Sequence, residues 1–153
     1  MQPSVCSRSA RTLLVALGLA LAGSGALAQS SGEQALPQGF QTTPVLKSGT
    51  TAGGARISYP QSGTPEIVSV TGVLEPGGRT ARHQHPVPVY VYVLEGTLKV
   101  QADDHEPREY RAGEAFLEDV DHWHQAFNEG DTPTKILVVF VGEEGKPTTI
   151  AAQ

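Results

Sequence analysis

The sequence predicts an all-β protein with a single folded domain, either a β-sandwich or a small barrel. Short β-prone runs recur between residues 45 and 145, and turn residues separate them. No stretch in this region shows a convincing helical period. Many short strands at such spacing are typical of sandwiches and small barrels. The length of 153 residues fits one domain.

The expected strands are rich in Val, Ile, Thr and aromatic residues. They are residues 55–59, 66–74, 89–94, 97–101 and 135–141. Gly, Pro, Asp and Asn clusters mark the breaks between them, at 76–78, 95–96, 103–104, 112–113 and 128–131. Two further segments, 50–54 and 61–65, have the composition of hairpin loops.

The first 28 residues have the pattern of a secretory signal peptide. Arg8 and Arg11 precede an apolar run that ends in Ala26-Leu27-Ala28. Glycines interrupt this run short of the roughly 20 apolar residues that a membrane span needs. We therefore expect an exported protein, periplasmic or secreted, without a stable membrane anchor. The expected order is signal peptide 1–28, N-terminal arm 29–44, barrel domain 45–145 and C-terminal tail 146–153.

Composition limits the partners of the exported chain. Cys6, the only cysteine, lies in the leader, so disulfides and thiolate metal ligands are excluded from the remainder. The formal net charge is −5, and loss of the leader's two arginines makes it more negative. Nucleic acids and anionic membranes select basic surfaces. Neither is therefore expected as a partner.

Four of the five histidines form two pairs, each with one residue between its members. His83 and His85 form the first pair, and His122 and His124 form the second. On a strand, such residues point to one face about 6.5–7 Å apart. Two imidazoles at this spacing can converge on one ion at about 2.0–2.1 Å each. The alternative is four solvent-facing histidines on polar strands.

The two histidine segments resemble the two motifs of the cupin family. The first motif here is Gly77, five residues, His83-x-His85, three residues, position 89, six residues and Gly96. The second is Gly113, ten residues, His124, three residues and Asn128. With their flanking strands, these motifs cover residues 45–141.

The resemblance implies a double-stranded β-helix, a jelly-roll barrel that holds a divalent metal ion inside. The ligands carried over by position are His83, His85 and His124. The metal is Fe, Mn, Zn or Ni, and the partner is a small molecule. Three neutral imidazoles leave the ion its full charge, which favours an anionic ligand. The family also implies a homodimer.

One ligand of the usual cupin set is missing from this sequence. Val89 stands where the first motif usually has glutamate, and Asp119 and Asp121 stand where the second usually has Pro and Gly. Three interpretations follow. The site is a three-histidine face with open positions, which we take as the working interpretation. Alternatively, Glu118, Asp119 or Asp121 supplies the carboxylate, or the metal site has decayed.

His122 and Tyr90 are the candidate catalytic residues. His122 shares the strand parity of His124 and can act as a ligand, a proton shuttle or a solvated residue at the barrel mouth. Strict alternation over residues 87–93 directs the valines inward and Tyr90 outward. A bulge at Pro86 or Pro88 would turn Tyr90 toward the cavity instead.

The function expected from sequence is an exported protein that binds a divalent metal and a small molecule. As an enzyme it would be a dioxygenase or an isomerase or lyase, with the metal as Lewis acid or platform for O₂. The alternative is non-catalytic small-molecule binding or sensing. No G-x-S-x-G segment, P-loop or dinucleotide fingerprint occurs.

Overall fold

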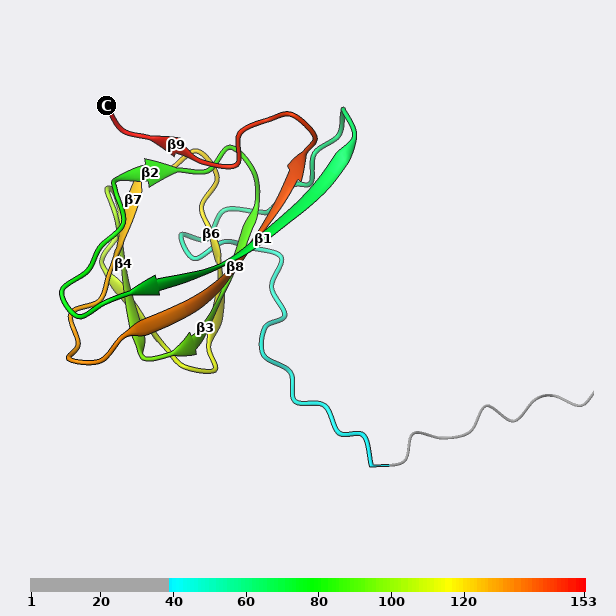
Figure 1. The fold of residues 1–153 in the computed structure, drawn as a ribbon. Coiled ribbons are helices and arrows are strands. Elements are labelled where there is room, and N and C mark those ends of the chain that lie inside the picture. The colour runs from blue at the N-terminus through cyan, green and yellow to red at the C-terminus, as the bar shows by residue number, and fades with distance from the viewer. Residues whose placement is uncertain (1–38) are drawn as a thin grey trace, which may run out of the picture. The chain divides into compact units, whose positions relative to one another are not determined.

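The computed structural model describes residues 39–153, and these form an all-β domain (Figure 1). The predicted signal peptide, and the predicted arm up to residue 38, lie outside the described residues. The part of the chain that the structure describes contains no helix long and apolar enough to cross a membrane.

Within residues 39–153, nine strands form two antiparallel sheets. The four-stranded sheet has the order β1-β8-β3-β6, and the five-stranded sheet has the order β5-β4-β7-β2-β9. The strands are β1 (Pro65–Leu74), β2 (His83–Gln84), β3 (Val89–Glu95), β4 (Thr97–Ala102), β5 (Arg108–Arg111), β6 (Ala115–Glu118), β7 (His124–Phe127), β8 (Thr134–Glu143) and β9 (Ile150–Ala151).

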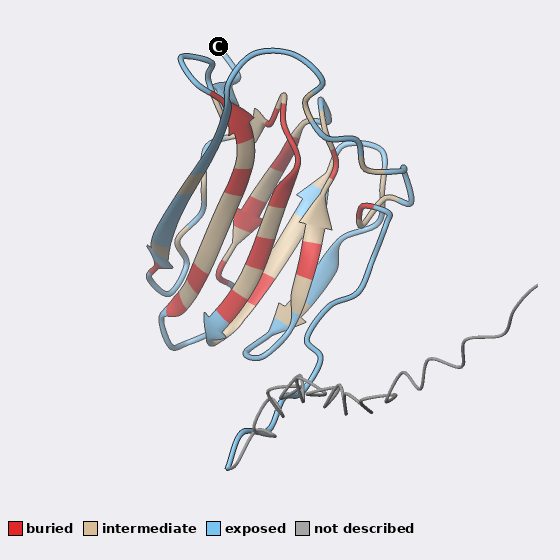
Figure 2. Cartoon of the chain, turned by 90° about the vertical axis from the view of Figure 1, so that its right-hand side faces the viewer, coloured by how far each residue is buried: buried red, intermediate tan, exposed pale blue. Residues whose placement is uncertain are grey.

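The hydrophobic core lies between the two sheets. Buried and partly exposed residues alternate along β3 and β8, which Figure 2 shows as red and tan bands. Such alternation places every second side chain inside. Val91, Val93 and Leu98 are at most 1% exposed, and each such side chain contributes about 1.5–3 kcal/mol to stability. The other core members are Leu74, Val87, Val89, Phe116, Ala126, Ile136 and Phe140.

The long apolar strands match the sequence prediction, whereas the short ones do not. Four expected strands correspond to β1, β3, β4 and β8. The expected strand at residues 55–59 is absent, and only Arg56 forms an isolated bridge, with Thr50. This segment is largely exposed, so it has no apolar face to hold it against a sheet. Strand geometry was expected for the two histidine pairs, which lie on or beside β2 and β7. Sequence patterns did not indicate β5, β6 or β9.

The segment after residue 145 is part of the barrel in the structure. Its strand β9 pairs with β2, with Ala151 opposite His83 and Ile150 opposite Gln84. The tail predicted for residues 146–153 therefore completes the edge of the five-stranded sheet. A two-residue strand has too little pattern to be visible in a sequence.

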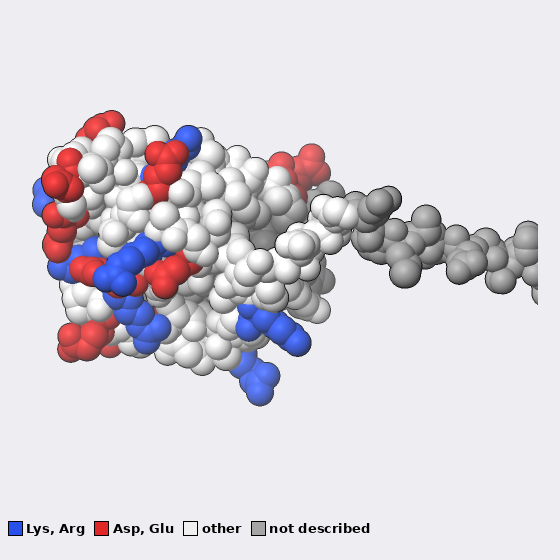
Figure 3. Space-filling model, turned by 90° about the horizontal axis from the view of Figure 1, so that it is seen from below, with Lys and Arg blue, Asp and Glu red and all other residues white. Residues whose placement is uncertain are grey.

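Acidic and basic side chains are intermixed on the face shown in Figure 3. Surface ion pairs link strands and loops, such as Lys99 Nζ to Glu129 Oε1 at 2.8 Å and Arg82 to Asp103. Exposed pairs of this kind contribute about 0–1 kcal/mol each. These surface pairs therefore contribute little to the stability of the barrel.

Candidate metal centre

The three histidines expected from sequence as ligands lie together between the sheets. His83 on β2 is directly opposite His124 on β7 in the antiparallel register. His85 follows β2 and forms a parallel bridge with Val120. One ring nitrogen from each histidine lies within 4.8 Å of the others. The pairing of two very short strands thus gathers residues that are 39 to 41 positions apart.

Backbone carbonyls fix the orientation of all three imidazoles. The Nδ1 atoms of His83, His85 and His124 lie 2.7, 2.7 and 2.9 Å from the carbonyl oxygens of Ala81, Thr148 and His122. A carbonyl only accepts hydrogen bonds, so each Nδ1 carries the proton. Each Nε2 then offers its lone pair to the centre of the cluster. Metal-binding histidines are held in this way in proteins.

The surroundings of the cluster fit a bound cation. His85 and His124 are buried, and the Nε2 atom of His124 has no hydrogen-bond partner. Buried polar atoms are nearly always paired, so an unpaired lone pair facing two other imidazoles indicates a ligand position. Burial lowers the pKa of His83, which keeps that ring neutral and able to coordinate.

A fourth polar group, the Glu118 carboxylate, contacts two of the three histidines. Its Oε2 atom lies 3.1 Å from His85 Nε2, and its Oε1 atom lies 3.4 Å from His124 Nε2. Burial disfavours the charged carboxylate, but His124 and His85 outweigh this effect and lower the pKa of Glu118 to about 2. Glu118 is therefore an anion at neutral pH.

The other two acidic candidates lie away from the histidines. Asp119 is buried, but its carboxylate accepts hydrogen bonds from the Thr51 hydroxyl and from the Gly53 amide, the latter at 2.9 Å. Asp121 is exposed and adopts a left-handed conformation with φ of 58°. Both residues thus lie in the turn segment between β6 and β7 and outside the strand that carries His124.

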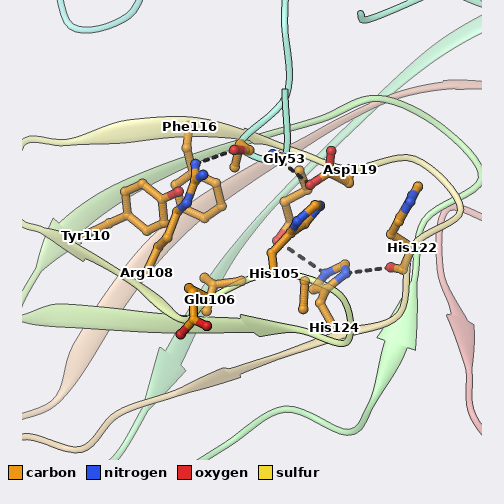
Figure 4. A pocket seen from close by; sticks show the side chains of 13 residues that line it. Gly53, His105, Glu106, Arg108, Tyr110, Phe116, Asp119, His122 and His124 are labelled. Carbon is orange, nitrogen blue, oxygen red and sulfur yellow. Dashed lines mark hydrogen bonds and ion pairs between the residues drawn. The ribbon is translucent and has the colours of Figure 1, made fainter. Parts of the chain in front are cut away.

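A narrow cavity of about 30 Å³ opens beside the cluster. That volume accommodates about two water-sized groups. Glu118 and His124 are among its lining residues, and Arg108, Tyr110 and Phe116 line the wall to the left in Figure 4. The Tyr110 and Phe116 rings stack with centroids 3.8 Å apart. The complete lining is Ala52, Gly53, Val100, Ala102, His105, Glu106, Arg108, Tyr110, Phe116, Glu118, Asp119, His122 and His124.

The two candidate catalytic residues lie outside the three-histidine cluster. Tyr90 is on the opposite face of β3 from the buried valines, because strict alternation holds from Val89 to Val93. His122 precedes β7 and lines the cavity, with its Nε2 atom 3.7 Å from Asp104 Oδ2. The turn before β7 directs it away from His124 (Figure 4).

A family comparison covers the residues that build this centre. The cupin domain family matches residues 70–140, which include both histidine segments. The domain has the cupin fold. No curated protein sequence matches the chain.

Several solved structures resemble this cupin over 56% of its chain. An oxalate oxidase in complex with the substrate analogue glycolate is 26% identical, with a TM-score of 0.51 and 46% of its own chain covered. The DMSP lyase DddQ from Ruegeria pomeroyi DSS-3 is 21% identical (TM-score 0.50, 43% covered). The oxalate decarboxylase of Lactobacillus farciminis in its formate complex is 24% identical (TM-score 0.50, 26% covered). The cupin thus spans less than half of each of these chains.

The loop at residues 51–54 forms one wall of the cavity in this cupin. Asp119 holds the loop through Thr51 and Gly53, and Arg108 donates a hydrogen bond to the Ala52 carbonyl. A Cβ atom on Gly53 would lie 2.5 Å from both Asp119 Oδ2 and His105 Nε2. Only glycine lets the loop approach this closely.

Replacement of Gly53 by alanine is expected to lower the free energy of unfolding by about 1–2 kcal/mol, because Asp119 must release at least one buried hydrogen bond. Urea denaturation of the metal-free protein measures this change. Gly49→Ala is the matched control, since a Cβ there meets nothing within 4 Å. Equal stability of the two variants would show that Asp119 does not hold the loop.

Proposed function

We propose that this cupin binds one divalent metal ion through His83, His85 and His124, and a small carboxylate at that ion. The observation that carries the proposal is the common orientation of the three rings. Each Nδ1 is bonded to a backbone carbonyl, and the three histidines meet within 4.8 Å. A bound ion would supply Lewis-acid chemistry or a platform for O₂.

The cavity favours a small anionic ligand. Its volume of about 30 Å³ admits few non-hydrogen atoms. Arg108 lines the wall and donates one N–H to the Ala52 carbonyl, and a guanidinium carries five N–H donors in all. A planar guanidinium matches the two oxygens of a carboxylate. The likeness to an oxalate oxidase that binds glycolate supports the same ligand class.

Metal content tests the proposal on the protein purified without a histidine tag. We expect about one equivalent of metal per chain after incubation with Fe(II), Mn(II), Ni(II) or Zn(II). We expect none in the His83→Ala/His124→Ala double variant. His105→Ala is the matched control and should retain the metal, because its ring is not among the three. Absence of metal from the unmodified protein with all four ions would refute the proposal.

Carboxylate binding is the second part of this test. Glycolate and oxalate are added to the metal-loaded protein, and isothermal titration calorimetry measures their affinity. The neutral diamide oxamide serves as the comparison for charge. We expect the anions to bind at least tenfold more tightly than oxamide. Equal binding of all three would contradict an anion site.

A non-catalytic binding protein is the second candidate function. It is favoured by the position of Tyr90, which faces away from the cavity, and by His122, which is 45% exposed and directed toward Asp104. Incubation of the metal-loaded protein with oxalate or glycolate and O₂ separates the two candidates. Consumption of either anion supports an enzyme, and binding without consumption supports a sensor or scavenger.

Export and dimerisation are further parts of the proposal. Export rests on the signal-peptide pattern of residues 1–28 and is measured by fractionation of cells that express the full chain. Dimerisation is implied by the family, and exposed Ile67 and Val73 on edge strand β1 support it. Light scattering of the purified protein measures the mass in solution.

A further inference from the structure

Position 89 and residue Glu118 lie at the same point of the barrel wall. In the register of β3 and β6, Val89 is directly opposite Glu118. Directly opposed residues point to the same face of a sheet, with Cβ atoms about 4.5–5.5 Å apart. Val89 is 1% exposed and faces the interior. The backbone of Glu118 on β6 therefore lies beside position 89, where the first cupin motif usually carries its glutamate.

The Glu118 side chain also reaches the histidines. Its two oxygens lie 3.1 Å from His85 Nε2 and 3.4 Å from His124 Nε2, and the side chain is 10% exposed. Neither oxygen has a hydrogen bond to a backbone amide or to a hydroxyl among the hydrogen bonds of the described residues. The carboxylate is thus directed at the imidazoles alone.

The polar atoms of this contact fit a cation bound between them. The Nδ1 protons of His85 and His124 are committed to the carbonyls of Thr148 and His122. In neutral rings, both Nε2 lone pairs would then face a carboxylate, an arrangement of acceptors only. A buried charge without a partner is strongly disfavoured. Protonation of a ring or a shared metal ion removes the conflict, and a metal ion removes it for both rings at once.

We propose that Glu118 is the fourth protein ligand of the metal ion, supplied by β6 in place of the glutamate that β3 lacks at position 89. This inference rests on the proposed three-histidine centre. It changes the character of that centre, because one carboxylate reduces the net charge of the loaded site from +2 to +1. A fourth protein ligand also leaves fewer coordination positions of the ion open to other molecules, which suits a small ligand.

The test compares metal binding by the unmodified protein, Glu118→Gln and Glu109→Gln. Glu109 is an exposed carboxylate on β5, in the other sheet, so its variant is a matched control for the loss of one negative charge. Calorimetry measures affinity for Mn(II), and the visible absorption of bound Co(II) reports its ligands. We expect Glu118→Gln to lose affinity by at least tenfold and to alter the Co(II) spectrum. Glu109→Gln should change neither.

The outcomes separate this inference from the proposed function. Unchanged affinity and an unchanged Co(II) spectrum in Glu118→Gln would overturn the inference and leave the three-histidine centre intact. Absence of metal from the unmodified protein would refute the centre itself. Circular dichroism of the metal-free proteins establishes that each variant is folded.

Glu118→Asp provides the second variant in case Glu118→Gln does not fold. It keeps the charge and withdraws the carboxylate by one methylene. A ligand at this position is expected to lose affinity for Mn(II) and to shift the Co(II) spectrum in the folded Asp variant as well. Full retention of both by Glu118→Asp would overturn the inference, because the shorter side chain cannot keep the same coordination.

Discussion

Replacement of Gly96 by alanine is expected to lower the free energy of unfolding by about 2–5 kcal/mol, the sum of a left-handed backbone penalty and a steric clash. Gly96 is the single residue between β3 and β4, which belong to different sheets. The chain turns there with φ of +75°. A Cβ atom would lie 2.8 Å from both the Pro133 carbonyl oxygen and Thr134 Oγ1.

The clash at Gly96 cannot be relieved by a flexible side chain. The Pro133 carbonyl belongs to the backbone, and Thr134 is fully buried with its hydroxyl donated to the Thr97 carbonyl at 2.8 Å. An alanine would therefore displace the start of β8 or break this bond. Because β8 is the neighbour of both β1 and β3, the displacement would affect the centre of the four-stranded sheet.

Gly113→Ala is the matched control for this prediction. Gly113 also has positive φ, +92°, but a Cβ there meets nothing within 4 Å. It should cost only the backbone penalty of about 1–2 kcal/mol. Urea denaturation of both variants measures the difference. Equal destabilisation of the two variants would show that the corner at Gly96 tolerates a side chain despite its closeness to Pro133 and Thr134.

The fold class was predictable from the sequence because the long strands carry a clear apolar pattern. The predicted all-β cupin barrel is confirmed, and the alternating valines of β3 form its core. The two-residue strands β2 and β9 have no such pattern. They exist because each is held by its neighbours, as β2 is by His124 on β7 and by β9.

The candidate site was predictable in part, for a related reason. Motif spacing identified the three histidines, which the structure brings within 4.8 Å of one another. The working interpretation of a bare three-histidine face did not include Glu118, which was one of three acidic alternatives. A turn at Asp121 separates β6 from β7, so strand parity cannot be carried across it. The register of β3 with β6 places Glu118 beside Val89.

Removal of residues 148–153 is expected to weaken metal binding by about 10–100-fold, the usual effect of losing the hydrogen-bond partner of a ligand histidine. The Thr148 carbonyl lies 2.7 Å from His85 Nδ1, and Thr149 Oγ1 lies 3.2 Å from the same atom. Calorimetry with Mn(II) on a chain that ends at Pro147 measures the loss. We also expect a lower free energy of unfolding, because the truncated chain lacks β9.

A chain that ends at Ala152 is the control for this truncation. It keeps β9 and the hydrogen bond from the Ala152 amide to the Arg82 carbonyl, 2.9 Å long. Its metal affinity should equal that of the full chain. If the longer truncation also binds Mn(II) normally, the Thr148 carbonyl does not orient His85. If affinity falls only in the longer truncation, the last strand belongs to the metal centre as well as to the sheet. The site would then depend on β9 for a backbone acceptor, which no histidine motif encodes.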